Sequence, residues 1–203
     1  MTNPSTTARA RMDQTLQSYE GSARDYDKLV DAHRPPHILR ALQQLVDAVP
    51  PGGRVLEIRS GPGRDADVLE SLGLAVRRTD ATQAFVDLMT ERGKRAELLN
   101  VVTDELGGPY HGVLAMGVLI HVDRHQLDAV LRKIHAALRP GGAFLAAMRR
   151  GEGETTGDYH TVCWTRERFT ERLAAAGLGV RWDADSVGRD GNDWITYLAC
   201  RAP

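Results

Sequence analysis

The chain is 203 residues long, with 42% hydrophobic and 26% charged residues, which is typical of one ordinary globular domain. Its 26 basic and 27 acidic residues give a formal net charge of −1, so no overall field favours nucleic acid or an anionic membrane. The polar N-terminus lacks the apolar segment of a signal peptide, no apolar run could span a bilayer, and Cys163 and Cys200 form no Cys-x-x-Cys pair. We therefore expect a cytoplasmic protein without nucleic-acid or membrane partners. The oligomeric state is left open.

The first fifty residues predict a cap in front of the main fold. Residues 1–10 are expected to be a disordered lead. Apolar residues then recur at three- or four-residue spacing over 11–31 and 37–49, which indicates two amphipathic helices. A Pro-Pro pair separates these helices, and a Pro-Pro-Gly-Gly run ends the second. We therefore divide the chain into a lead and helical cap (1–50) and an α/β domain (51–203), within one structural domain overall.

From residue 54 onward, strand-like and helix-like segments alternate, which predicts a parallel sheet with helices on both faces. The last two strands leave no room for a helix between them, so they must pair as an antiparallel hairpin. The expected strands lie near 54–58, 75–79, 96–100, 112–116, 142–148, 179–186 and 193–200, and the expected helices near 64–72, 82–92, 124–138 and 165–176.

The most informative stretch is residues 53–66, Gly-Arg-Val-Leu-Glu-Ile-Arg-Ser-Gly-Pro-Gly-Arg-Asp-Ala. An apolar run feeds a turn with Gly61 and Gly63, and a helix can follow. Such a loop can lie against an adenosine-type cofactor, because glycine removes the Cβ at the closest approach. Glu57 precedes the turn, and Asp80 lies about twenty residues beyond it, where this architecture places its ribose ligand.

The same loop also fits a dinucleotide fingerprint, Gly-x-Gly-x-x-Ala. Glu57 would repel a pyrophosphate but attract the ammonium group of a methionine moiety. The long cap and the C-terminal hairpin also argue against a dinucleotide fold. Arg59 and Arg64 could hold phosphates, so an NAD(P)-binding protein is kept as a distant alternative.

The stretch resembles the first motif of class I S-adenosylmethionine-dependent methyltransferases, Glu/Asp-x-Gly-x-Gly-x-Gly, with Arg59 in place of the first glycine. The resemblance extends from about residue 15 to about residue 200. It implies a Rossmann-like, doubly wound, mostly parallel seven-stranded sheet with a C-terminal antiparallel hairpin. It also implies S-adenosylmethionine as cofactor and methyl transfer to a small-molecule acceptor. The matching segments are Tyr19 to Tyr26, Thr79-Asp80-Ala81-Thr82, Leu98 to Val101, Tyr110 to His121 and Arg139-Pro140-Gly141-Gly142.

The resemblance also implies the cofactor-binding residues. Asp80 would accept hydrogen bonds from both ribose hydroxyls. Asn100 would contact the adenine, or else form a turn, and Tyr26 would close over the cofactor, or else pack as a core residue. The full predicted set is Tyr26, Glu57, Arg59, Ser60, Gly61, Gly63, Asp80, Ala81, Thr82, Asn100, Val101 and Met116.

His121, beyond the fourth strand, is the best-placed general base, because histidine titrates near neutrality; it could instead cap a helix. His160, in the glycine-rich loop over residues 150–161, is the second candidate, and this loop is a candidate lid. No residue spacing predicts a metal site or a Ser-His-Asp arrangement.

Two positions depart from the family pattern. His111 stands at a usual Asp position. Arg59 would bring a cation close to the cofactor's sulfonium, where two unit charges repel by about 4 kcal/mol at an effective dielectric of about 20. Arg59 could pair with Glu57 or Asp80, or bind the cofactor carboxylate. Alternatively, the protein has lost methyl transfer and is a non-redox cyclase, an isomerase or a binding protein.

Overall fold

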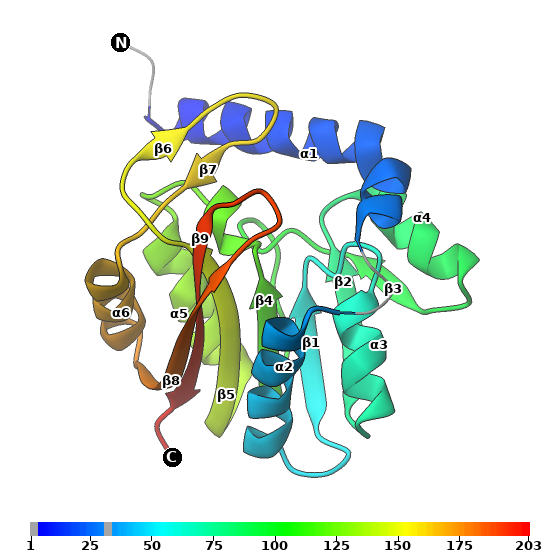
Figure 1. Cartoon of the computed structure of the whole chain (residues 1–203). Coiled ribbons are helices and arrows are strands. Elements are labelled where there is room, and N and C mark those ends of the chain that lie inside the picture. Colours follow the sequence, from blue (N-terminus) through cyan, green and yellow to red (C-terminus); the bar gives the residue numbers. More distant parts are fainter. Residues whose placement is uncertain (1–3, 31–33) are drawn as a thin grey trace.

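The computed structural model describes residues 4–30 and 34–203, and its centre is one seven-stranded sheet (Figure 1). The strand order is β3-β2-β1-β4-β5-β9-β8. The strands are β1 (Arg54–Ile58), β2 (Ala75–Asp80), β3 (Ala96–Leu98), β4 (Tyr110–Met116), β5 (Leu138–Arg149), β8 (Leu178–Val187) and β9 (Asp193–Arg201). The helices are α1 (Pro4–Leu29), α2 (Pro36–Ala48), α3 (Arg64–Ser71), α4 (Gln83–Glu91), α5 (Leu127–Ala137), α6 (Arg166–Ala175) and the short 3-10 helix η1 (Leu119–His121).

The strand directions match the expectation from the sequence. The strands β3, β2, β1, β4 and β5 run parallel to one another, whereas β9 pairs antiparallel with both β5 and β8. The predicted fold class is therefore confirmed. Between β4 and β5 the register passes from Tyr110↔Leu138 to Gly112↔Ala143, so the predicted Pro-Gly-Gly turn bulges out of the ladder, with Gly141 at φ +73.

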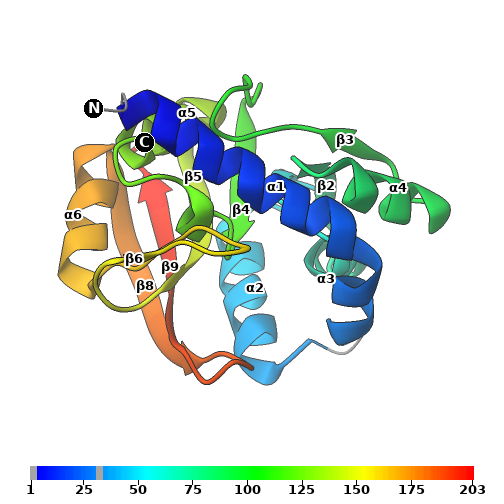
Figure 2. The ribbon, with the colours of Figure 1, turned by 90° about the horizontal axis from the view of Figure 1, so that it is seen from above.

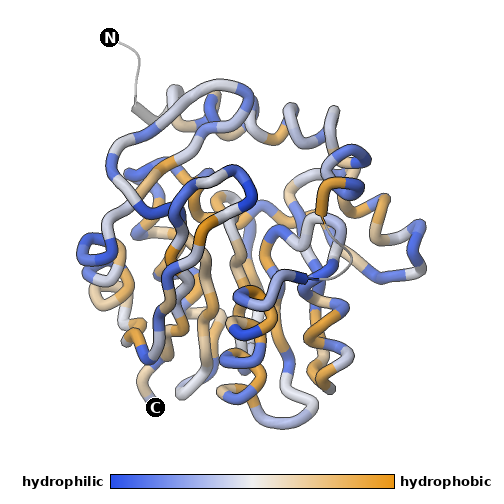
Figure 3. Tube along the Cα trace, in the orientation of Figure 1, coloured by the Kyte–Doolittle hydropathy of each residue, from blue (hydrophilic) through white to orange (hydrophobic). Residues whose placement is uncertain are grey.

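The sheet buries both faces, because alternate residues of its central strands enter two separate cores. In β4, Val113 and Ala115 pack with α5 and α6, whereas Leu114 packs with α2 and α3. Strand side chains alternate between faces, so a strand covered on both sides must be apolar throughout. Figure 3 shows these apolar strands at the centre of the molecule, with polar residues concentrated in the loops. No helix in the described ranges is long and apolar enough to cross a membrane.

Helix α1 lies across the end of the sheet where the parallel strands finish (Figure 2). The Glu20 carboxylate accepts hydrogen bonds from the backbone N–H groups of Gln83 (2.6 Å) and Ala84 (2.9 Å), so α1 supplies the missing cap of α4. The expected disordered lead is wrong for residues 4–10, which belong to α1; residues 1–3 lie outside the described part. Residues 4–10 have little apolar periodicity, so no local pattern indicated this part of α1, although Ala8 is buried.

Helix α2 belongs with the sheet. Its buried residues Leu42 and Leu45 share a core with Val55 of β1 and Leu145 of β5. We therefore propose that α1 alone is the cap, within the single structural domain that the sequence predicted.

The expected loop over residues 150–161 forms a short antiparallel ribbon, in which β6 (Glu154–Thr155) pairs with β7 (Thr161–Val162). This ribbon contacts α1. The backbone N–H of His160 donates to Thr15 Oγ1 (2.9 Å), and the hydroxyls of Ser22 and Tyr159 are hydrogen-bonded (3.2 Å). The two segments together cover the carboxyl ends of the parallel strands.

Candidate functional site

Two adjoining cavities lie beneath α1 at the carboxyl ends of the parallel strands, where open α/β sheets bind ligands. The smaller one, here called the inner cavity, has a volume of about 60 Å³. The larger one, here called the outer cleft, has a volume of about 660 Å³. Tyr19, Arg59 and His121 line both spaces, so these three side chains form the wall between them. The inner cavity is further lined by Met12, Thr15, Leu16, Ile58, Asp80, Ala81, Thr82, Leu99, Asn100, Val101, Val102, Val118 and Val122.

The glycine loop after β1 is shaped by positive φ angles. Gly61 (φ +53) and Gly63 (φ +79) adopt the left-handed region that glycine tolerates. A Cβ on Gly63 would come within 3.1 Å of Met89 Sδ, so both conformation and space require glycine there. Arg59, at φ +59, is the one non-glycine residue in this region among the described residues, and a side chain there costs about 1–2 kcal/mol.

Asp80, at the end of β2, is buried and holds this loop in place. Its Oδ2 accepts from the backbone N–H of Gly61 (2.9 Å), and its Oδ1 accepts from the backbone N–H of Thr82 (2.9 Å). Burial raises the pKa of the Asp80 carboxyl, while the Arg59 guanidinium and these N–H groups act in the opposite direction. The carboxylate is also part of the inner cavity's lining, so its remaining lone pairs can accept from a ligand.

Glu57 lies behind the glycine loop and is 3% exposed. Burial, reinforced by the nearby Asp65 carboxylate, raises the pKa of Glu57 to about 8. The Ser60 hydroxyl acts in the opposite direction on this carboxyl, but among the described residues the buried Glu57 Oε2 and Ser60 Oγ form no well-aligned hydrogen bond. Buried polar atoms of this kind are costly unless something pairs with them, so this part of the loop is prepared for a polar ligand.

Arg59 extends over the face of Tyr19, with its Cζ atom 4.4 Å from the ring centroid. Its Nη1 donates to the backbone carbonyl of Gly117 (3.3 Å). Burial alone would lower the pKa of this guanidinium, but Tyr19, Tyr26 and Asp80 raise it above its ordinary value. Arg59 therefore remains a cation. Among the described residues it forms no ion pair with a carboxylate, so the predicted pairing with Glu57 or Asp80 is wrong.

His121 is the middle member of a hydrogen-bonded chain. Its Nδ1 lies 2.7 Å from the backbone carbonyl oxygen of His160, which can only accept, so Nδ1 carries the proton. Nε2 then accepts from the Tyr19 hydroxyl at 3.1 Å. Burial and the Arg59 cation lower the pKa of His121 to about 3. The neutral tautomer of His121 with the proton on Nδ1 is therefore fixed by a hydrogen bond at each ring nitrogen.

The structure distributes the predicted site residues over three locations. The inner cavity brings together Arg59, Asp80, Ala81, Thr82, Asn100, Val101 and His121. The outer cleft contains Tyr26 and Met116 and shares Arg59 and His121. Glu57, Ser60, Gly61, Gly63 and His160 line neither space.

His160 requires a correction as a catalytic candidate. Its ring is 1% exposed and lies outside both cavities, with Nε2 at 3.7 Å from Glu154 Oε2. Its contribution to the site is the backbone carbonyl that orients His121. A histidine's own ring cannot be placed from its position in a loop, which is why the sequence misled here.

His111 lies at the opposite end of the sheet, at the start of β4. Its Nδ1 accepts from the backbone N–H of Arg54 (3.0 Å), and its Nε2 contacts the Arg139 guanidinium (2.7 Å). This departure from the family pattern is therefore structural and does not touch the candidate site.

Sequence reasoning missed several lining residues. Tyr19 is not among the predicted site residues, although it begins the Tyr19–Tyr26 segment that matches the family. The α1 side chains Met12 and Leu16, and the outer-cleft residues Arg149 and Trp194, carried no local signal. Their positions depend on how distant segments meet.

One cluster has the composition of a metal site. Ligand atoms of Asp123, Glu154 and His160 lie within 4.8 Å of one another. However, the Arg11 guanidinium pairs with both carboxylates, at 3.2 and 3.1 Å, and Arg124 pairs with Glu154 at 3.2 Å. These two cations already balance the two carboxylates, so the cluster joins α1 to the ribbon as an ionic contact.

The glycine loop, the carboxylate at the end of β2 and the two cavities lie at the edge where open α/β sheets bind their ligands. The chain belongs to the methyltransferase domain family, whose model matches residues 30–180. The family and fold expected from the sequence are thus confirmed. No curated protein sequence gave a match to the chain.

Solved structures show the same fold. The 1,6-didemethyltoxoflavin-N1-methyltransferase of Burkholderia thailandensis, with bound 1,6-didemethyltoxoflavin and S-adenosylhomocysteine, is 21% identical at a TM-score of 0.79. That match covers 100% of this chain and 92% of the other. The magnesium protoporphyrin IX methyltransferase of Synechocystis PCC 6803, with bound S-adenosylhomocysteine, is 14% identical (TM-score 0.72; 92% and 97% covered). The [4+2]-cyclase SpnF is 17% identical (TM-score 0.64; 81% and 80% covered).

Proposed function

We propose that this protein is a methyltransferase that uses S-adenosylmethionine and acts on a small-molecule acceptor. The observation that carries the proposal is the pair of adjoining cavities. The inner cavity presents a carboxylate suited to ribose, Asp80, and the outer cleft has room for an acceptor. Family membership supports methyl transfer over the NAD(P)-binding alternative. A cytoplasmic location stays a prediction from the sequence.

The residues around the inner cavity fit the cofactor chemically. Asp80 would hold the ribose hydroxyls, and Asn100 with Val101 would contact the adenine. The buried Glu57 Oε2 and Ser60 Oγ, which form no well-aligned hydrogen bond among the described residues, would suit the polar methionine end. When bound, S-adenosylmethionine supplies an electrophilic methyl group. The protein's own task is to align the acceptor with it and to exclude water.

The inner cavity holds only a few water molecules at its present volume of about 60 Å³. Four α1 residues line it: Met12, Thr15, Leu16 and Tyr19. Met12 Sδ also accepts from Asn100 Nδ2 at 3.3 Å, so α1 occupies the group proposed to contact the adenine. We infer that α1 must shift outward for a nucleoside to bind.

Calorimetric titration of the full chain with S-adenosylmethionine and S-adenosylhomocysteine tests this function, with NAD as the control ligand. We expect saturable binding of both adenosyl ligands and none of NAD. No heat with either adenosyl ligand at millimolar concentration would exclude the proposed function.

A second candidate is a protein of this family that no longer transfers methyl groups, such as a non-redox cyclase. Arg59 in the wall of the inner cavity favours it, and the similar fold of a [4+2]-cyclase shows that this architecture supports such chemistry. Incubation with S-adenosylmethionine labelled at the methyl group separates the two. Release of label to any acceptor eliminates the second candidate.

A further inference from the structure

The Arg59 side chain is a cation without an anionic partner at the wall between the two cavities. Within the described part of the chain, its guanidinium contacts the Tyr19 ring, the Tyr26 hydroxyl and the backbone carbonyl of Gly117, all of them neutral groups. Two other arginines of the outer cleft differ. Arg34 pairs with Asp65 (2.6 Å), and Arg149 pairs with Asp190 (2.5 Å). Since partly buried charges are normally paired, Arg59 requires an anion that a ligand can provide.

Among the described residues, the two side chains that form the wall together with Arg59, His121 and Tyr19, are poor proton acceptors at neutral pH. Both nitrogens of His121 are engaged, Nδ1–H with the His160 carbonyl and Nε2 with the Tyr19 hydroxyl. The pKa of His121 is lowered to about 3 by burial and by Arg59 and Arg149, and burial raises the pKa of Tyr19 to about 12. An acceptor that reacts at this wall must therefore arrive already ionised.

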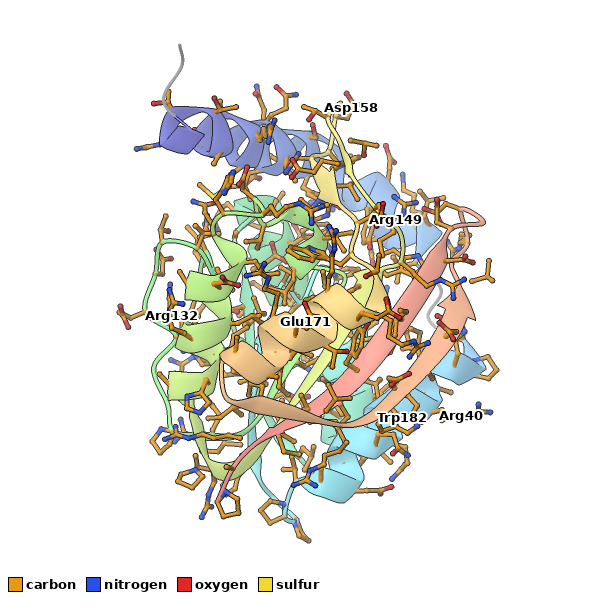
Figure 4. The ribbon with its side chains drawn as sticks, turned by 90° about the vertical axis from the view of Figure 1, so that its left-hand side faces the viewer. Arg40, Arg132, Arg149, Asp158, Glu171 and Trp182 are labelled. Carbon is orange, nitrogen blue, oxygen red and sulfur yellow. The ribbon has the colours of Figure 1, made fainter. Side chains whose placement is uncertain are left out.

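The remaining walls of the outer cleft suit a planar organic molecule. Aromatic rings come from α1 (Tyr26), the ribbon (Tyr159) and β9 (Trp194). Arg149 at the end of β5 lies over the Trp194 ring, with its Cζ atom 5.9 Å from the centroid. Figure 4 shows Arg149 near the turn between β8 and β9, at the covered end of the sheet. Guanidinium groups beside aromatic faces bind planar acids through charge and stacking together.

We propose that the acceptor is a small planar carboxylic acid, whose ionised carboxylate binds Arg59 and receives the methyl group to form a methyl ester. This inference rests on the proposed function. One carboxylate oxygen accepts from Arg59, while the other attacks the methyl carbon. The new carbon–oxygen bond replaces the carbon–sulfur bond of the cofactor, whose electron pair remains on sulfur. No proton has to be moved, which agrees with a site whose histidine is held neutral.

The first test measures binding, without turnover. The full chain is saturated with S-adenosylhomocysteine and then titrated calorimetrically with 2-naphthoate and with 2-naphthamide, which differ in charge but hardly in shape. We expect 2-naphthoate to bind about 10-fold to 100-fold more tightly, the range for hydrogen bonds to a charged group. Arg59→Gln should abolish this preference, and Arg59→Lys should retain part of it. Arg132→Gln, which changes an exposed arginine on α5 away from the cleft (Figure 4), should leave it intact.

Separate outcomes overturn the inference and the proposed function. Equal affinity for the acid and the amide, with S-adenosylhomocysteine bound, overturns the carboxylate assignment alone. Absence of S-adenosylhomocysteine binding, with a preference for 2-naphthoate that Arg59→Gln removes, overturns the methyltransferase proposal and leaves Arg59 as an anion ligand. If S-adenosylhomocysteine does not bind and 2-naphthoate is not preferred over 2-naphthamide, the methyltransferase proposal and the carboxylate assignment are both overturned.

A further control identifies the source of the carboxylate. If Arg59 binds the cofactor's own carboxylate, Arg59→Gln weakens S-adenosylhomocysteine but not 5′-methylthioadenosine, which lacks the amino-acid end. That result contradicts the proposal.

A second arm uses His37, an exposed histidine that lines the outer cleft from α2. If His37→Gln abolishes methyl-ester formation while 2-naphthoate binding persists, a base is needed and the proposal fails.

Discussion

Tyr19 and His121 are 102 residues apart in the sequence, yet the Tyr19 hydroxyl lies 3.1 Å from His121 Nε2. Their rings also meet edge to face, with centroids 5.7 Å apart. This contact joins α1 to the end of the sheet at the wall between the two cavities. The proton on Nδ1 is fixed by the His160 carbonyl, so the direction of the whole chain, from Tyr19 to His121 to His160, is determined.

Replacement of Tyr19 by phenylalanine tests this chain. Tyr19→Phe keeps the ring under Arg59 but leaves the buried Nε2 of His121 without a donor. We expect the free energy of unfolding to fall by about 0.5–1.5 kcal/mol, measured by urea denaturation. In the double variant Tyr19→Phe with His121→Gln, the two losses of unfolding free energy should not add, because each single variant already breaks the same hydrogen bond. Strict additivity would show that the hydrogen bond contributes nothing.

The neutral state of His121 predicts a loss of stability in acid. Its pKa is 6.5 in an unfolded chain and about 3 in the folded protein, where burial disfavours the charged form. As the pH falls from 6.5 toward 3, His121 becomes protonated in the unfolded state but stays neutral in the folded state. The unfolding free energy should therefore decrease, by up to about 1.4 kcal/mol per pH unit. This stability is fully present only above pH 6.5.

Comparison of the native chain with His121→Gln isolates this contribution from that of the carboxylates. The difference in unfolding free energy between the two should shrink as the pH falls through this range. A difference that stays constant with pH would mean that His121 titrates normally.

Arg59→Gly is expected to raise the affinity for S-adenosylmethionine. The change restores glycine at φ +59 and removes a cation from the place where the sulfonium is expected. S-adenosylhomocysteine, whose sulfur is neutral, should gain less, because only the steric part of the penalty applies to it. Dissociation constants for both ligands, measured by calorimetry, separate charge from bulk. Equal gains in affinity for the two ligands would assign the effect to the size of the arginine side chain. Weaker binding of both ligands would contradict the expectation.

Asp80→Ala should weaken S-adenosylhomocysteine binding by about 1.5–3 kcal/mol, the range for a lost hydrogen bond to a charged group. The variant also strips partners from the buried N–H groups of Gly61 and Thr82, so the protein itself should be less stable. Asp80→Asn keeps one acceptor oxygen and serves as the matched control. If the alanine variant binds as tightly as the native chain at a temperature where both are folded, Asp80 is not a ligand.

Much of the fold could be predicted from local pattern. An apolar run predicts strand β1, and the two glycines after it predict the turn. The spacing of a single carboxylate from that turn predicts the role of Asp80. The site could be predicted only in part. Arg149, Trp194 and Met12 reach it from segments whose neighbours are set by packing, and the pKa of His121 depends on burial that no local pattern reveals. The role of His160 was misjudged for the same reason, since its carbonyl, and not its ring, enters the site.

Ionic contacts attach α1 alongside the apolar cluster that Tyr19 and Ala23 form with Phe85 and Leu88 of α4. Besides the Glu20 cap, Arg11 pairs with Asp123 and Glu154, Arg24 with Glu91, and Asp27 with Arg64. Ionic contacts of this kind weaken as the salt concentration rises, because salt screens exposed charges. The apolar packing of the sheet beneath them is not screened in this way. Hydrogen exchange should therefore show α1 opening as a separate unit, faster at high ionic strength, while β1, β4 and β5 stay protected. Ionic strength would then set how quickly a nucleoside enters and leaves, without changing the chemistry inside.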